Sequence, residues 1–145
     1  MGTFTMLPTT TSGAVLTQLG KPLEIIDGIR LPPLKKGQLL VEVHYAGLCH
    51  SQLKEARGER GEDPYVPHML GHEGTGSVLS VGPGVDKVSV GDAVVLGWIK
   101  GKGLDAMGTE YIGPGGEIIN AGAVTTFSRH TIVYENSCLL YTSDA

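Results

Sequence analysis

The chain has 145 residues, of which 41% are hydrophobic and 18% charged, and its formal net charge is −4. This length fits one domain, and a mildly acidic balance without a basic run argues against nucleic acid as the main partner. No apolar run approaches the roughly 18 residues of a membrane span, the N-terminus lacks the features of a leader peptide, and two cysteines make no disulfide framework, so we expect a cytoplasmic protein that does not enter a membrane.

In chain order, residues 1–12 are rich in threonine and are expected to be flexible. The runs 14–18 and 23–29 flank a turn that contains glycine and proline, and together they predict a hairpin. Residues 39–45 alternate along the chain, with one face formed by Leu39, Val41, Val43 and Tyr45 and the other by Leu40, Glu42 and His44. Such alternation predicts a strand with one buried face.

A short helix is expected over 51–57, followed by a charged surface loop over 57–67. Residues 101–116 contain six glycines and one proline and are therefore expected to be irregular. The remaining strands are expected at 74–81, 92–99, 117–120 and 130–134. Short strands with regular turns predict a mainly β fold, a small and partly open barrel with short helices. No helical pattern is long enough for a parallel doubly wound sheet.

Two short segments hold most of the chemical information. Cys49 follows the strand predicted at 39–45, and His72 stands between Gly71 and Glu73. A cysteine thiolate and a histidine nitrogen are both good zinc ligands, and a catalytic zinc takes three protein ligands and keeps one position open. Taken alone the pair is weak, because a lone buried cysteine is more often a small hydrophobic residue.

The spacing around these two residues resembles a known family. Gly-His-Glu at 71–73 is followed by Gly76, Gly82 and Val85, and a Gly-x-Cys-His-Ser turn lies upstream, 23 positions from cysteine to histidine (72 − 49). Over residues 13–136 the chain resembles the zinc-dependent alcohol dehydrogenases of the medium-chain dehydrogenase/reductase family. The resemblance implies a GroES-like β-barrel domain.

The same resemblance implies a role for each site residue. Cys49 and His72 would be two of the three zinc ligands, with Glu73 beside the metal. Ser51 would take the proton of the substrate hydroxyl, and His50 would reach the pyrophosphate of the cofactor. The implied reaction is hydride transfer between an alcohol and NAD or NADP, with zinc polarising the oxygen of the alcohol, aldehyde or ketone. The full-length parent is expected to be a homo-oligomer.

Some positions depart from the pattern of the family. Gln52 stands where an aspartate often braces the zinc-binding histidine, and Lys54 where a histidine often passes the proton to solvent. Residues 99–116 contain no cysteine in the place of the four-cysteine lobe, so no structural zinc is expected. The third ligand and the nucleotide-binding Rossmann domain do not follow within the chain, so we expect an N-terminal fragment that is inactive alone.

The segment 137–145 does not resemble the family, so we expect a foreign tail after Asn136 and no role for Cys138. His68 lies four positions before His72, but the adjacent proline and glycine argue against a helix, so His68 is expected in a loop. Two other functions remain open on the same scaffold. One is a zinc-free quinone oxidoreductase, and the other is a non-enzymatic GroES-like barrel module.

Overall fold

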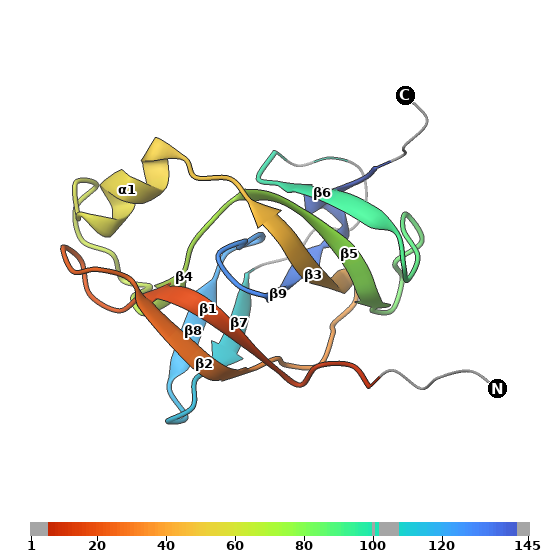
Figure 1. The fold of residues 1–145 in the computed structure, drawn as a ribbon, viewed down its shortest axis with the longest axis horizontal. Coiled ribbons are helices and arrows are strands. Elements are labelled where there is room, and N and C mark those ends of the chain that lie inside the picture. Colours follow the sequence, from red (N-terminus) through yellow and green to blue (C-terminus); the bar gives the residue numbers. More distant parts are fainter. Residues whose placement is uncertain (1–5, 100, 102–107, 142–145) are drawn as a thin grey trace.

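The computed structural model describes residues 6–99, 101 and 108–141. Its strands form two sheets, one of them closed into a barrel, which confirms the predicted mainly β, GroES-like class (Figure 1). The helices are α1 (His50–Ala56) and the 3₁₀ helix η1 (Glu135–Ser137). The strands are β1 (Thr10–Leu16), β2 (Glu24–Arg30), β3 (Gln38–Ala46), β4 (His68–Met69), β5 (Glu73–Val81), β6 (Ala93–Gly97), β7 (Thr109–Ile112), β8 (Ile118–Ala121), β9 (His130–Tyr134) and β10 (Cys138–Leu140). No helix in the described part of the chain has the length and apolar character needed to cross a membrane.

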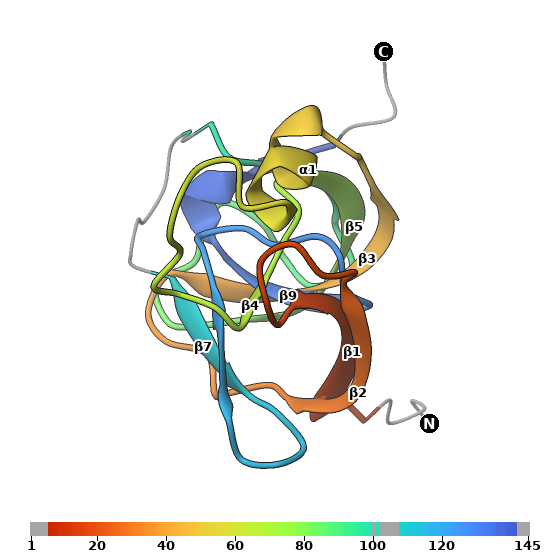
Figure 2. The same cartoon turned by 90° about the vertical axis from the view of Figure 1, so that its left-hand side faces the viewer.

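The barrel contains five strands in the order β1-β2-β7-β8-β4. The predicted hairpin is confirmed, because β1 and β2 pair antiparallel with Val15 opposite Glu24. Short ladders close the ring: β2 meets β7 at Arg30, and β4 lies antiparallel to β1 and parallel to β8. In Figure 2 the barrel strands β1, β2 and β7 lie below α1.

The second sheet has the order β10-β6-β5-β3-β9. Its strand β3 supplies both hydrophobic cores, since Leu39 and Val41 pack into one cluster and Leu40 into the other. Alternate residues of a strand point to opposite faces, so β3 separates the two cores. The prediction of one buried face over 39–45 is therefore wrong: the first part of β3 is buried on both faces, and Tyr45 is 77% exposed.

Two segments expected to lack regular structure contain strands. β1 begins at Thr10, inside the segment 1–12 that was expected to be flexible, and the buried Thr11 accepts a hydrogen bond of 2.9 Å from the backbone N–H of His130. β7 lies inside 101–116, where it pairs with β2 and β8. Residues 102–107 of that segment lie outside the described residues. Partner strands, rather than local composition, determine structure at these positions.

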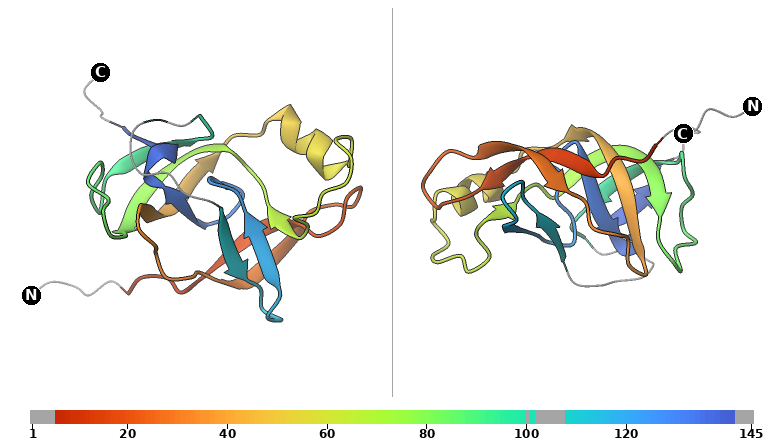
Figure 3. Two further views of the ribbon diagram at one scale, coloured as in Figure 1. Left: turned by 180° about the vertical axis from the view of Figure 1, so that it is seen from behind. Right: turned by 90° about the horizontal axis from the view of Figure 1, so that it is seen from below.

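The segment after Asn136 also takes part in the fold. β10 pairs antiparallel with β6, with Cys138 opposite Leu96, and Cys138 is 1% exposed within the core of the sheet. The segment expected to be a foreign tail after Asn136 thus contributes a strand to the sheet. Residues 142–145 of the expected tail lie outside the described residues. Figure 3 shows α1 at one end of the molecule and the edge formed by β6 and β10 at the other.

Tyr111 on β7 should make the free energy of unfolding depend on pH in the alkaline range. Its side chain is fully buried, and its hydroxyl oxygen accepts a 2.8 Å hydrogen bond from the backbone N–H of Ile132. Burial raises the pKa of Tyr111 above its ordinary value of 10.0. The unfolded chain therefore loses this proton first, so the stability that Tyr111 contributes is present below pH 10.0 and falls as pH rises above it.

Tyr111→Phe is expected to lower the free energy of unfolding by about 1–3 kcal/mol at neutral pH, because it leaves the Ile132 N–H unpaired. Urea titrations that compare this variant with the wild type should show the difference shrinking above pH 10.0. Tyr45→Phe, at an exposed position, is the control and should match the wild type. A difference that stays constant into the alkaline range would contradict the assignment.

Candidate metal centre

The end of β3 and the start of β5 lie side by side and bring the two candidate ligands together. Ala46 is opposite Gly74 in the β3–β5 ladder, and the N–H of Gly47 donates a 2.9 Å hydrogen bond to the carbonyl oxygen of Glu73. Cys49 follows two residues after this link, and His72 immediately precedes Glu73. Backbone pairing therefore holds the Cys49 turn next to the Gly-His-Glu segment.

Gln52 connects the two candidate ligands through one side chain. Its Oε1 accepts a 3.1 Å hydrogen bond from the backbone N–H of Cys49, and its Nε2 lies 2.6 Å from Nδ1 of His72. Gln52 is only 8% exposed, so water contributes little to this amide. With Nδ1 engaged, the other ring nitrogen of His72, Nε2, is the one left for a metal ion.

Ser51 polarises the thiol of Cys49. The Ser51 hydroxyl donates a 3.2 Å hydrogen bond to Cys49 Sγ. This hydrogen bond is the largest cause of a lowered pKa of Cys49, followed by the backbone N–H of Ser51, while the charge of Glu73 acts in the opposite direction. A thiolate is the form of cysteine that binds metals, so the neighbourhood of Cys49 favours the ligand state.

The remaining predicted residues surround this pair. Glu73 is exposed, and its side chain lies against Gly47, where a Cβ atom would stand 2.6 Å from Glu73 Cγ. His50 is the first residue of α1 and is exposed. Trp98 follows β6, and its ring centroid is 6.2 Å from that of His72 in an edge-on arrangement. The fold thus gathers Cys49, Ser51, His72 and Glu73 and leaves His50 on the solvent side of the same turn.

The donor set suits a zinc ion but supplies only part of a site. A sulfur and an imidazole nitrogen are ligand types that zinc prefers, and Gln52 contacts the backbone N–H of Cys49 and the ring of His72. Among the described residues, the single group of three potential ligands with atoms within 4.8 Å of one another consists of Glu55, Asp63 and His68, and neither Cys49 nor His72 belongs to it. The described residues therefore bring together two candidate ligands, one fewer than the three protein ligands that a catalytic zinc takes.

His68 does not lie in a loop as expected. It belongs to β4 and is 7% exposed, with Nδ1 2.9 Å from the carbonyl oxygen of Met69 and Nε2 2.6 Å from Asp63 Oδ2. Glu55 Oε1 lies 3.5 Å from the same Nε2. Both ring nitrogens of His68 therefore face oxygen atoms of neighbouring residues. These contacts tie the 57–67 loop to β4 and α1.

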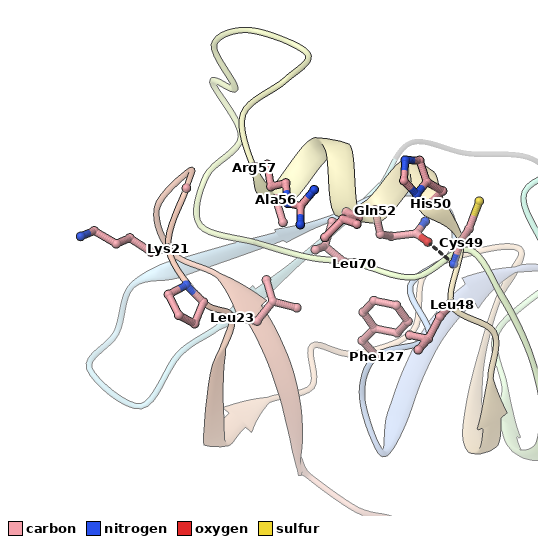
Figure 4. Close-up of a pocket in the computed structure, with 13 residues that line it drawn as sticks. Lys21, Leu23, Leu48, Cys49, His50, Gln52, Ala56, Arg57, Leu70 and Phe127 are labelled. Carbon is pink, nitrogen blue, oxygen red and sulfur yellow. Dashed lines mark hydrogen bonds between the residues drawn. The ribbon is translucent and has the colours of Figure 1, made fainter.

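A cavity of about 650 Å³ lies beside α1 (Figure 4). Its walls are mainly apolar, and Cys49, His50 and Gln52 border one side of it. Figure 4 shows the sulfur of Cys49 directed away from the part of the cavity near Leu23 and Lys21. The other lining residues include Leu48, Leu53, Leu70 and Phe127. Sequence reasoning missed this cavity, because its walls come from four distant segments without a shared motif.

Thr126 is a second residue that sequence reasoning missed. It is 1% exposed and packs against both Gly71 and Gly74, where added Cβ atoms would meet its side chain. Its N–H donates a 3.1 Å hydrogen bond to the carbonyl oxygen of Leu70. Gly71 also has a φ of 95°, which favours glycine. The glycines on either side of His72 and Glu73 therefore allow the 125–127 segment to support the ligand segment closely.

Comparison with known proteins agrees with this fold. The sequence model of the family "Alcohol dehydrogenase GroES-like domain" matches residues 35–142 and so runs past Asn136. The class-3 alcohol dehydrogenase of Dictyostelium discoideum is 32% identical over an alignment of 160 positions, gaps included. The alignment covers 94% of this chain and 42% of that protein. The chain thus spans less than half the length of this relative.

Two solved structures share the fold. An alcohol dehydrogenase zinc-binding domain protein from Burkholderia ambifaria superposes with a TM-score of 0.79 at 25% identity, covering 94% of this chain and 43% of that one. A quinone oxidoreductase from Coxiella burnetii superposes with a TM-score of 0.66 at 20% identity, over 94% of this chain and 38% of that one. The second likeness concerns the fold alone. With a family match over most of its length, the chain belongs to the alcohol dehydrogenase family as a GroES-like domain.

Proposed function

We propose that this chain is the metal-binding part of a zinc-dependent oxidoreductase that transfers a hydride between an alcohol and NAD or NADP. The observation that carries the proposal is the shared support of Cys49 and His72 by Gln52, together with the Ser51 hydroxyl 3.2 Å from the Cys49 sulfur. The substrate class is a small alcohol and the corresponding aldehyde or ketone. Relatives named as alcohol dehydrogenases support this class.

Each residue has a defined task in this proposal. Cys49 and His72 would hold the zinc ion, which when bound supplies a Lewis acid for the substrate oxygen. Ser51 would accept the proton of the substrate hydroxyl, since its hydroxyl already stands beside the Cys49 sulfur. The exposed His50 would bind the phosphates of the cofactor, and Glu73 would adjust the charge near the metal. Three protein ligands complete a catalytic zinc, so the third would come from outside the described residues.

The two alternative functions differ from this proposal because neither of them requires a bound metal ion. A quinone oxidoreductase without zinc and a non-enzymatic barrel module can both use the same fold, as the likeness to the Coxiella burnetii structure illustrates. Neither has use for a cysteine and a histidine that are held next to each other by one amide. Metal binding through Cys49 therefore separates the proposed function from both.

Titration of the reduced chain with cobalt(II) tests the proposal, because cobalt replaces zinc and reports thiolate ligation by its absorption. We expect a sulfur-to-cobalt charge-transfer band in the wild type, its loss in Cys49→Ser, and weaker binding in His72→Asn. Loss of an outer interaction already lowers metal affinity by about 10–100-fold, and loss of a ligand should exceed this range.

Cys138→Ser is the matched control. Cys138 is 1% exposed, and burial raises the pKa of its thiol, so it should contribute nothing to the cobalt spectrum. A wild-type chain without the charge-transfer band, or a band that depends on Cys138, would reject the proposed metal site.

A further inference from the structure

The hydrogen-bond partners of Gln52 determine the orientation of its side-chain amide. A backbone N–H can only donate, so the atom of Gln52 that lies 3.1 Å from the Cys49 nitrogen must be the oxygen. The amide nitrogen then faces Nδ1 of His72 at 2.6 Å. Because that nitrogen is a donor, Nδ1 must accept, and the neutral ring carries its proton on Nε2.

This arrangement conflicts with metal binding. Nδ1 is engaged by Gln52, so a metal ion can reach only Nε2, and a ligand nitrogen must be free of its proton. Binding therefore requires the proton of the ring to stand on Nδ1. A proton on Nδ1 would face the amide nitrogen of Gln52, so that two hydrogen-bond donors would oppose each other. Gln52 is only 8% exposed, so water contributes little there. Reversing the amide would relieve His72 but place a donor against the Cys49 N–H.

We propose that Gln52 is a positioning residue that holds metal-free His72 in the Nε2–H tautomer, and that metal binding forces the amide to give up either His72 or the N-terminal cap of α1. Gln52 is the third residue of α1, and its bond to the Cys49 N–H closes the first turn of that helix. Metal occupancy and the start of α1 are therefore coupled through one side chain. The metal-dependent half of this inference rests on the proposed function.

A glutamate at this position would remove the conflict. Gln52→Glu keeps the shape of the side chain, and both of its oxygens accept hydrogen bonds. One oxygen can accept from the Cys49 N–H while the other accepts from a proton on Nδ1 of His72. The variant should therefore hold His72 in the tautomer that leaves Nε2 free for a metal.

The tautomer of His72 is the first readout, because it needs no metal. Long-range ¹H–¹⁵N correlation spectra of the metal-free chain, in alkaline buffer where the imidazole is neutral, report which ring nitrogen carries the proton. The resonance of His72 is identified by its loss in His72→Asn. We expect the Nε2–H tautomer in the wild type and the Nδ1–H tautomer in Gln52→Glu. An Nδ1–H tautomer in the wild type, or no change in the variant, would overturn the inference.

Cobalt affinity is the second readout. Gln52→Glu should bind cobalt(II) about tenfold more tightly than the wild type, with the same charge-transfer band. Gln52→Leu keeps a side chain of similar size without hydrogen bonds and should show no single preferred tautomer. Equal cobalt affinities in the wild type and Gln52→Glu would refute the coupling to the metal. Failure of both to bind cobalt would instead reject the proposed function, while the tautomer experiment would still decide the role of Gln52.

Discussion

Gly76→Ala should destabilise the chain strongly, by about 3 kcal/mol, at the upper end of the range for overpacked interiors. Gly76 lies in β5 between its neighbours β3 and β6, opposite Val43 and Val94. A Cβ atom there would overlap the backbone carbonyl oxygen of Glu42 and stand 2.6 Å from Val41 Cγ1. Backbone atoms cannot rotate away as side chains do, so β3 and β5 would have to separate.

Gly97→Ala is a matched control for this experiment. Gly97 is also a strand glycine of the same sheet, at the end of β6, but a Cβ atom there would meet nothing within 4 Å. Its substitution should change the free energy of unfolding by less than about 0.5 kcal/mol. Urea denaturation followed by circular dichroism measures both variants. Equal stability of Gly76→Ala and Gly97→Ala would show that the sheet tolerates a methyl group between β3 and β5.

The same substitution should also disturb the candidate site. β3 and β5 carry the Cys49 turn and the His72 segment at adjoining ends, so any separation of the two strands moves one ligand relative to the other. Folded Gly76→Ala, prepared at low temperature, should therefore bind cobalt(II) more weakly than Gly97→Ala.

Glu135→Ala should be the second strongly destabilising change, by about 3 kcal/mol or more. The Glu135 side chain is 1% exposed, and its Oε1 accepts hydrogen bonds from the backbone N–H groups of Asp86 and Lys87, at 3.1 and 2.9 Å. Hydrogen bonds to a charged group are worth about 1.5–3 kcal/mol each, and removing the carboxylate leaves two donors without their acceptor. Thermal and urea unfolding measure the loss.

Two further variants separate the role of the carboxylate from general effects of substitution. Glu135→Gln keeps one acceptor oxygen in a side chain of nearly the same shape. Its free energy of unfolding should therefore lie between those of the wild type and Glu135→Ala. Glu24→Ala removes a carboxylate at an exposed position and should leave stability unchanged. Hydrogen exchange at β10 should accelerate in Glu135→Ala, because η1 connects Glu135 directly to that strand. A Glu135→Ala variant as stable as Glu24→Ala would contradict the assignment.

Local patterns predicted the strands that have their own sequence signal. The hairpin of β1 and β2 and the strands β5, β6 and β9 lie where apolar runs alternate with turn residues. Period-two alternation and glycine or proline turns are properties of a few consecutive residues, so they can be recognised without knowledge of the partner strand.

Other strands could not be recognised in this way. β7 stands in a glycine-rich segment and forms because Tyr111 enters the barrel core and β8 lies beside it. β10 lies in a segment that was expected to be a foreign tail, yet the family model extends through it and Cys138 completes the core of the second sheet. The burial of His68 depends likewise on Asp63 and on Glu55 from α1. Pairing and burial depend on residues far away in the sequence, which no local window contains.

The sequence by itself determined which residues of the candidate site carry reactive chemistry: Cys49, Ser51 and His72 have the ligand and proton-transfer groups that the proposed reaction needs. Only the tertiary structure decided how they meet. The pairing of β3 with β5 places Cys49 near His72, and the Gln52 amide then joins them with opposite hydrogen-bonding demands at its two ends. Residue identity specifies which atoms can donate or accept, but the direction of each hydrogen bond depends on distances of about 3 Å between segments that only the folded chain brings together.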